Sequence, residues 1–98
     1  MSQVTWSGYI FNVHSPDSSF PARGGVYVFD KGYEFNKKAY YVGQTSNLRD
    51  RLSGHEKWDD AEDLGATHIH IRLEAIESTR LRIEREIIDE YDPPLNDD

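Results

Sequence analysis

Residues 24–55 hold side chains that can bind a phosphate and handle a proton. Tyr27 and Tyr41 carry phenols, Arg51 a guanidinium and His55 an imidazole. A guanidinium offers a planar fork that fits phosphate oxygens. Phenols and imidazoles hold or transfer protons when they are close to a reacting group. This stretch therefore predicts a site for an anionic substrate, provided that the fold brings the four groups together.

The local pattern predicts a β-hairpin followed by a helix. Residues 25–29 and 39–43 are rich in β-branched and aromatic residues and are separated by a polar segment, which is typical of two paired strands. Ser46 is the expected N-cap of the helix after them. Arg51 and His55 are four residues apart, so we expect them to share one face of that helix.

A further acid lies on the last predicted helix, which we expect from Ser78 to about Tyr91. Glu84 falls on its apolar stripe, between Leu81 and Ile88. A carboxylate on such a stripe is costly unless it is paired or binds a metal. Either an ion pair with a neighbouring arginine or a metal site explains it. A lone carboxylate with several waters suits Mg²⁺ or Mn²⁺.

These features, taken in order, resemble the GIY-YIG nuclease family. The resemblance covers residues 24–96 and is carried by five motifs: Gly25-Val26-Tyr27, Tyr41-Val42-Gly43, the Arg51/His55 pair, Ile83-Glu84 and Pro93-Pro94-Leu95-Asn96. It implies a metal-dependent endonuclease that hydrolyses DNA phosphodiester bonds with Mg²⁺ or Mn²⁺ as cofactor. The positions that it marks as catalytic are Tyr27, Tyr41, Arg51, His55 and Glu84.

In this interpretation Glu84 is also the metal ligand, and His55 takes a proton from a tyrosine or from water. The resemblance places Asn96 at the family's terminal asparagine, and Gln44 stands where many relatives have lysine. Other roles are open for the same residues. The tyrosines could be core aromatics, Arg51 could pair with Asp50 or an acid of the last helix, and Asn96 could hold backbone after the proline turn.

Charge is unevenly distributed along a chain whose formal net charge is −7. Residues 24–55 carry five basic and three acidic side chains, a net +2, whereas residues 56–98 carry five and fourteen, a net −9. Because a phosphate-binding surface is usually basic, we expect DNA to be contacted by Lys37, Lys38, Arg49 and Arg51. The acids of residues 59–63 should face away.

The 98 residues predict one α/β (α+β) domain, with a three-stranded, mainly antiparallel sheet flanked by helices. Residues 1–23 would add one edge strand at 6–13 and a loop. A short helix at 56–66 should end at Gly65, with Trp58 and Leu64 as its apolar contacts. Residues 67–73 should form a strand whose exposed side carries His68 and His70, or a metal pair.

The composition fits a cytoplasmic protein, because there is no cysteine, no membrane-length apolar run and no secretory signal pattern. Three functions are compatible with these features. The first is a self-sufficient DNA endonuclease. The second is a non-catalytic module that binds nucleic acid or protein. The third is a cutting subunit whose protein partner supplies the grip on DNA, which the acidic charge favours. The oligomeric state is left open.

Overall fold

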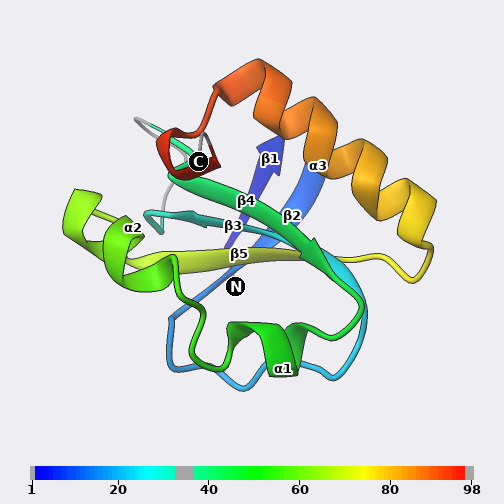
Figure 1. Ribbon diagram of the computed structural model, residues 1–98, viewed down its shortest axis with the longest axis horizontal. Helices are drawn as coiled ribbons and strands as arrows, with labels where there is room; N and C mark the ends of the chain where they lie inside the picture. The colour runs from blue at the N-terminus through cyan, green and yellow to red at the C-terminus, as the bar shows by residue number, and fades with distance from the viewer. Residues whose placement is uncertain (1, 33–36, 97–98) are drawn as a thin grey trace.

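The computed structural model describes residues 2–32 and 37–96 and contains a five-stranded antiparallel sheet (Figure 1). The strand order is β1-β2-β5-β3-β4. The strands are β1 (Gln3–Trp6), β2 (Tyr9–His14), β3 (Gly25–Asp30), β4 (Tyr41–Thr45) and β5 (His68–Leu73). The predicted α+β class is confirmed, with five strands rather than three. The middle of the connection between β3 and β4 lies outside the described residues.

The two additional strands come from a turn within the segment that we expected to be one edge strand. Ser7 and Gly8 have φ values of 51° and 85°. Two central residues with positive φ form the type of turn that matches the twist of a hairpin. The chain therefore reverses at this point, pairing Trp6 with Tyr9, and β2 continues the sheet by pairing with β5.

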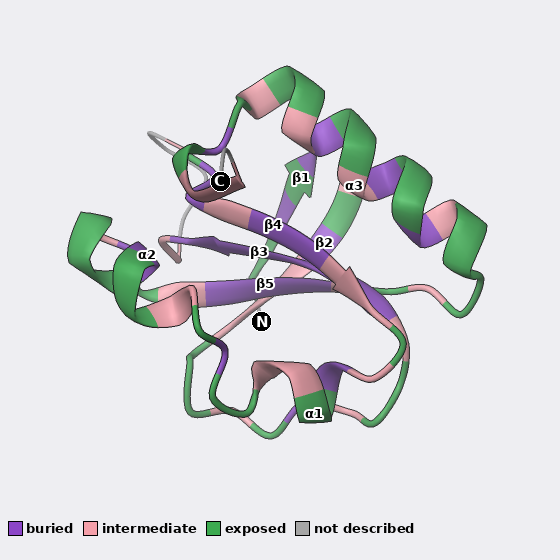
Figure 2. Cartoon of the chain, in the orientation of Figure 1, coloured by how far each residue is buried: buried purple, intermediate pink, exposed green. Residues whose placement is uncertain are grey.

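Helices cover both faces of this sheet. One face carries α1 (Leu48–Leu52) and α2 (Trp58–Leu64), and the other carries α3 (Glu77–Tyr91), which is followed by the short 3-10 helix η1 (Pro94–Asn96). All six residues of β3 are buried (Figure 2). Val26 and Val28 pack towards α3, while Tyr27 and Phe29 pack towards α1 and α2. Alternate residues of β3 thus serve two separate cores.

Covering both faces changes the environment predicted for β5. His70 is fully buried, whereas Leu73, at the end of the strand, is 42% exposed. Trp6 donates its indole N–H to His70 Nδ1 at 3.1 Å, and His70 Nε2 donates to the Lys31 carbonyl at 2.5 Å. Both ring nitrogens are therefore satisfied by the fold. The exposed or metal-binding roles considered for His70 are wrong, and the described residues contain no cluster of three ligating side chains.

The last helix is shifted in phase from the predicted one. It begins at Glu77 with Ile76 as N-cap, so Ser78 is not the cap. Its buried residues are Arg80, Ile83 and Ile87, whereas Leu81 is 46% exposed. Arg80 can lie inward because its guanidinium donates to Gln44 Oε1 at 2.9 Å and to two carbonyls of the preceding loop.

The two short helices also differ in detail from the prediction. Asn47, not Ser46, caps α1, and its side chain accepts a hydrogen bond from the Asp50 N–H. Helix α1 ends at Leu52, so His55 lies beyond it and does not share its face with Arg51 through helical spacing. Helix α2 ends at Gly65 as predicted, but Leu64 is 50% exposed.

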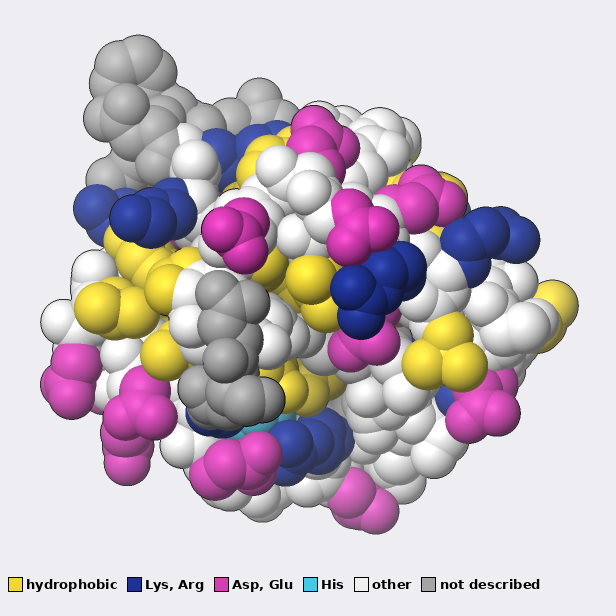
Figure 3. Space-filling model, turned by 45° about the horizontal axis from the view of Figure 1, so that its top comes forward, with side chains coloured by type: hydrophobic (Ala, Val, Ile, Leu, Met, Phe, Trp, Pro, Cys, Tyr) yellow, Lys and Arg dark blue, Asp and Glu magenta, His cyan; other side chains and the backbone are white. Residues whose placement is uncertain are grey.

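The face that carries α3 mixes charges of both signs (Figure 3). Two ion pairs at i,i+4 spacing, Arg82–Glu86 and Arg85–Asp89, neutralise four of the helix's charges. Glu84 is half-buried, while every other acid of α3 is exposed. Within residues 2–32 and 37–96, no helix is both long and apolar enough to span a membrane.

Candidate active site

The site begins where the ring of Tyr27 crosses the neighbouring strand at a glycine. Tyr27 on β3 pairs with Gly43 on β4. A β-carbon added at Gly43 would lie 2.4 Å from the Tyr27 hydroxyl and 2.5 Å from its Cζ. Only a residue without a side chain leaves room for this ring. The glycine of the second motif therefore fixes the path along which the Tyr27 hydroxyl passes over β4.

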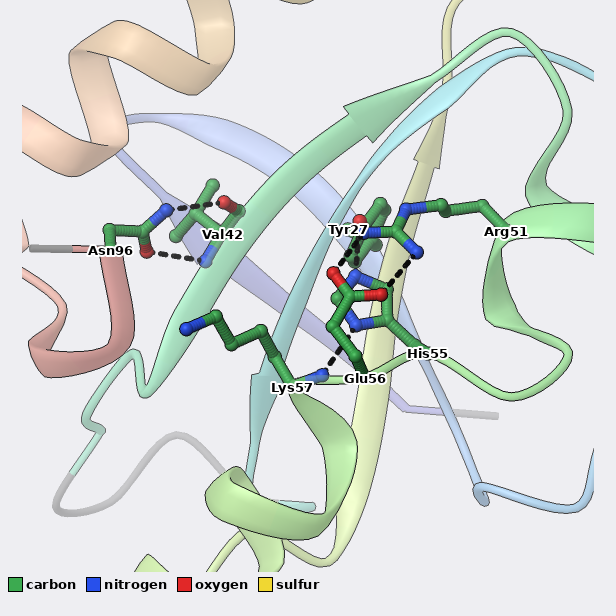
Figure 4. A network of polar contacts seen from close by, with 7 residues as sticks. All are labelled: Tyr27, Val42, Arg51, His55, Glu56, Lys57 and Asn96. Atoms are coloured by element: carbon green, nitrogen blue, oxygen red, sulfur yellow. Dashed lines mark hydrogen bonds and ion pairs between the residues drawn. The ribbon is translucent and has the colours of Figure 1, made fainter. Parts of the chain in front are cut away.

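His55 lies against that hydroxyl, and its tautomer follows from its second contact. The Lys57 backbone N–H donates to His55 Nδ1 at 3.0 Å, so the proton of the neutral ring is on Nε2. Nε2 is 2.8 Å from the Tyr27 hydroxyl oxygen, which accepts its hydrogen bond (Figure 4). Burial and the charge of Arg51 lower the pKa of His55 to about 4. His55 is thus a neutral donor here, and not the proton acceptor that the sequence suggested.

Arg51 forms an ion pair with Glu56, an acid that the sequence analysis did not consider as its partner. Its Nη1 and Nη2 donate to the two carboxylate oxygens of Glu56 at 2.9 and 2.7 Å (Figure 4). This paired hydrogen bond raises the pKa of Arg51 and lowers that of Glu56 to about 2. A two-pronged contact of this kind is also how a guanidinium holds a phosphate. Neither Asp50 nor an acid of α3 pairs with Arg51 in the described structure.

Tyr41 and Glu84 complete the set. Tyr41 lies beside His55, with ring centroids 5.2 Å apart, and beside Tyr27 at 6.3 Å. Burial raises the pKa of both tyrosines, the positive charge of Arg51 opposes that rise, and the negative charge of Glu84 adds to it. Glu84 therefore acts on the same centre from α3. Four elements, namely β3, β4, α1 and α3, and the 55–57 segment contribute to it.

The carboxylate of Glu84 has the character expected of a cation ligand. Burial raises its pKa, and no hydrogen bond or ion pair to it is found among residues 2–32 and 37–96. The ion pair with a neighbouring arginine, one of the two explanations that the sequence allowed, is not formed in this part of the chain. Neutralisation by a hydrated divalent cation fits a single half-buried carboxylate. Glu84 is thus suited to supply one carboxylate ligand to Mg²⁺ or Mn²⁺.

The structure does not bring Lys37 or Asn96 into this centre. Lys37 donates its ammonium to the Thr5 carbonyl and lies 4.6 Å from the ring centroid of Trp6, on the α3 side of the sheet. Asn96 donates to the Val42 carbonyl and accepts from the Val42 N–H, at 2.8 and 2.9 Å (Figure 4). It thereby pairs with the outer edge of β4, which is a structural role.

The remaining two predicted substrate contacts lie on different elements. Arg49 is exposed on α1, two residues before Arg51. Lys38 is exposed at the end of the β3–β4 connection, and its backbone N–H donates to Asp30 Oδ2 at 3.2 Å. Arg49 is therefore the predicted contact that lies closest along the chain to the tyrosine–arginine centre.

Comparison with known proteins was decisive for the fold. The sequence matches no protein-family model and no curated protein. Solved structures of the GIY-YIG N-terminal endonuclease domain of UvrC from Thermotoga maritima do match it. A point mutant bound to its catalytic divalent cation has a TM-score of 0.61 at 23% identity, over 76% of this chain and 82% of that one.

The magnesium-bound domain gives a TM-score of 0.60 at 22% identity, over 76% of this chain and 83% of that one. The protein has the GIY-YIG fold. The family resemblance found in the sequence is confirmed at the level of the fold, since identity this low carries the fold alone. The candidate site is formed by Tyr27, Tyr41, Arg51, His55 and Glu84. Asn96 lies apart from them and bonds to the edge of β4 that does not pair with β3.

Two functional features could not be found from the motifs. Glu56 follows His55 directly, yet nothing in its spacing indicates that it rather than Asp50 pairs with Arg51. The Lys57 backbone N–H sets the tautomer of His55, and a backbone donor leaves no signal in residue type. The only sequence signal for either was the placement of an acid and a short loop immediately after the predicted helix.

Proposed function

We propose that this protein is a metal-dependent endonuclease that hydrolyses DNA phosphodiester bonds, acting as the cutting module of a larger system. The observation that carries the proposal is the convergence of a donor-paired phenol, a forked guanidinium and a half-buried carboxylate. Tyr27 accepts a hydrogen bond from His55, while the charge of Arg51 lowers the pKa of Tyr27 and that of Glu84 raises it. Phosphodiester hydrolysis requires a group for the water proton and charge at the phosphate.

In this proposal Arg51 exchanges Glu56 for the oxygens of the scissile phosphate. The guanidinium already holds a carboxylate by two N–H donors, and a phosphodiester presents an equivalent pair of acceptor oxygens. The exchange is accessible because the Arg51 and Glu56 side chains are 35% and 63% exposed. Arg51 then neutralises charge that develops on the phosphate during attack.

Tyr27 is the proposed acceptor of the proton from the attacking water. Its oxygen already receives the His55 Nε2–H, a hydrogen bond that favours the phenolate. Burial opposes ionisation and raises the pKa of Tyr27. The cleavage rate should therefore increase with pH above neutrality. Glu84 would hold the divalent cation. When bound, such a cation supplies positive charge beside the phosphate and the leaving oxygen.

The charge distribution supports a protein partner that supplies affinity for DNA. The chain has a net charge of −7, and the ammonium of Lys37 donates to the Thr5 carbonyl. Few cations are available to release counterions from DNA. The matching structures are themselves an N-terminal endonuclease domain of UvrC. We propose a comparable division between cutting and binding for this chain.

Nicking of supercoiled plasmid tests the proposal. We expect purified protein to convert supercoiled to open-circular DNA in Mg²⁺ or Mn²⁺ and not in EDTA. Arg51→Ala should slow nicking ~10²–10³-fold, while Arg49→Ala, a matched loss of charge on the same helix, should leave the chemical step intact. Absence of nicking by folded wild-type protein at any metal concentration would favour the non-catalytic binding module instead.

A further inference from the structure

A cavity of about 270 Å³ with apolar and acidic walls lies directly beside the candidate site. Phe29 and Ile69 of the sheet contribute to its lining, together with Pro16, Leu52 and Trp58. The rings of Trp58 and Phe29 form a T-shaped pair, with centroids 5.1 Å apart and planes at 85°. This contact packs the half-buried indole against the sheet while part of its surface remains accessible. The cavity thus offers an aromatic surface and aliphatic surroundings.

The same cavity is bordered by groups of the candidate site. His55 lines it, and Nε2 of that ring is 2.8 Å from the Tyr27 hydroxyl. Glu56, which holds Arg51, lines it as well, and Asp59 in the first turn of α2 adds a second carboxylate. A group bound in this cavity would therefore lie against Glu56, the residue that binds Arg51. Glu56 and Asp59 thus give the lining hydrogen-bond acceptors, and no lysine or arginine is among the lining residues.

A second cavity of about 490 Å³ continues from the first, because both are lined by Pro16 and Leu52. Its other lining residues are Phe20, Arg49 and three serines, Ser18, Ser19 and Ser53. A cavity with an aromatic wall beside one that holds Arg49 and three serines provides places for a base and for a neighbouring phosphate of a single nucleic-acid strand.

We propose that the Trp58 cavity binds an unpaired nucleobase of the strand that is cut, and that it prefers bases with an exocyclic amino group. The proposal deepens the nuclease function and rests on it. Stacking on Trp58 supplies affinity for any base. The carboxylates of Glu56 and Asp59 accept hydrogen bonds from the amino groups of cytosine or adenine, which thymine lacks. Enclosure of an unstacked base in an apolar pocket is how enzymes gain access to a single nucleotide.

Binding of short single strands in EDTA tests the proposal without requiring cleavage. The probes are hexanucleotides of deoxycytidine, deoxyadenosine or thymidine, and a deoxycytidine hexamer with an abasic position. We expect Trp58 fluorescence to be quenched by the cytosine and adenine probes at lower concentration than by the others. The anisotropy of dye-labelled probes measures the affinity of Trp58→Leu, which lacks this signal, and the substitution should weaken binding of the cytosine and adenine probes roughly 5- to 100-fold, the range for loss of one stacked base. Trp6 is fully buried on the other face and gives a constant background.

Two charge-matched variants isolate the base preference. Asp59→Asn should reduce the preference for cytosine over thymine, whereas Asp63→Asn on the same helix, outside the cavity, should preserve it. Equal affinity for all four probes, or unchanged affinity in Trp58→Leu, would overturn the base pocket. Selective binding by a protein that never nicks plasmid would retain the pocket and overturn the nuclease. Nicking that is unaffected by Trp58→Leu in a protein without base preference would do the reverse.

Discussion

Substitution of Gly43 by alanine tests how the fold positions Tyr27, the proposed acceptor of the water proton. The new β-carbon would lie 2.4 Å from the Tyr27 hydroxyl and 2.5 Å from Cζ, whereas ordinary van der Waals contact begins near 3.4 Å. The ring must therefore move by about 1 Å, and a misplacement of that size typically costs ~10²-fold in rate. Overpacking of this kind typically costs about 1–3 kcal/mol of stability. We expect Gly43→Ala to stay folded and to cleave about a hundred times more slowly.

A double-mutant cycle shows whether the loss passes through the Tyr27 hydroxyl. Tyr27→Phe keeps the ring and removes the oxygen, so Gly43→Ala in that background should cost similar stability but no further rate. Gly8→Ala is the matched control for stability. Gly8 has φ of 85° and open space around its α-carbon, so the variant is strained without a clash. It lies in the turn between β1 and β2, at the other edge of the sheet from β4.

The assays are urea unfolding for stability and single-turnover plasmid nicking for rate. Gly8→Ala should lose stability without losing activity, whereas Gly43→Ala should lose both. A Gly43→Ala protein that is folded and nicks at the wild-type rate would refute the role assigned to this glycine. A further rate loss on adding Gly43→Ala to Tyr27→Phe would show that the glycine acts on something other than the hydroxyl.

Three further predictions follow from specific contacts. Glu56→Gln should strengthen binding of a DNA duplex, because the anion that competes for Arg51 is removed, and Glu62→Gln should not; fluorescence anisotropy at two salt concentrations compares them. Arg51→Ala should slow single-turnover cleavage ~10²–10³-fold, far more than it weakens binding. Stability should decrease as pH falls from 6.5 towards 4, because burial lowers the pKa of His70 to about 4 and its unfolded form binds the proton first. Asp30 opposes this trend, since burial raises its pKa to about 6, so Asp30→Asn should lose more stability on acidification in urea unfolding than wild type.

The sequence predicted correctly the positions of residues that depend on local patterns along the chain. Tyr27 and Tyr41 were placed on paired strands because β-branched and aromatic runs around a polar turn are a local signal. Glu84 was predicted to be the inward-facing acid of its helix, and it is the one acid of α3 that is not exposed. The GIY-YIG fold itself followed from motif order along the chain, which the structural comparison confirmed.

Contacts that depend on a distant segment could not be predicted. Lys37 donates to the Thr5 carbonyl of β1, and the hairpin that places β1 depends on the Ser7–Gly8 turn; its contact with DNA stays a prediction. Leu81 was placed inward because an arginine is a poor candidate for a core. Arg80 takes that position by donating to loop carbonyls that lie close only after folding.

The role of His55 could not be predicted because it depends on backbone geometry. Helical spacing suggested a shared face with Arg51 and a proton-accepting ring. In the structure the chain leaves the helix after Leu52, and the Lys57 N–H occupies Nδ1. The imidazole is therefore a donor to Tyr27. Residue type alone cannot distinguish these two roles, since either ring nitrogen can carry the proton.

Metal-dependent nicking by matched glutamate variants tests the central claim most directly. Glu84→Gln and Glu86→Gln remove one charge each from the same helix, from a half-buried and an exposed position respectively. We predict that wild type and Glu86→Gln nick supercoiled plasmid at a rate that increases with Mn²⁺ and saturates, and that folded Glu84→Gln does not nick across the same range. Equal activity of the two variants, or nicking by wild type in EDTA, would contradict the account of this site as a metal-dependent endonuclease.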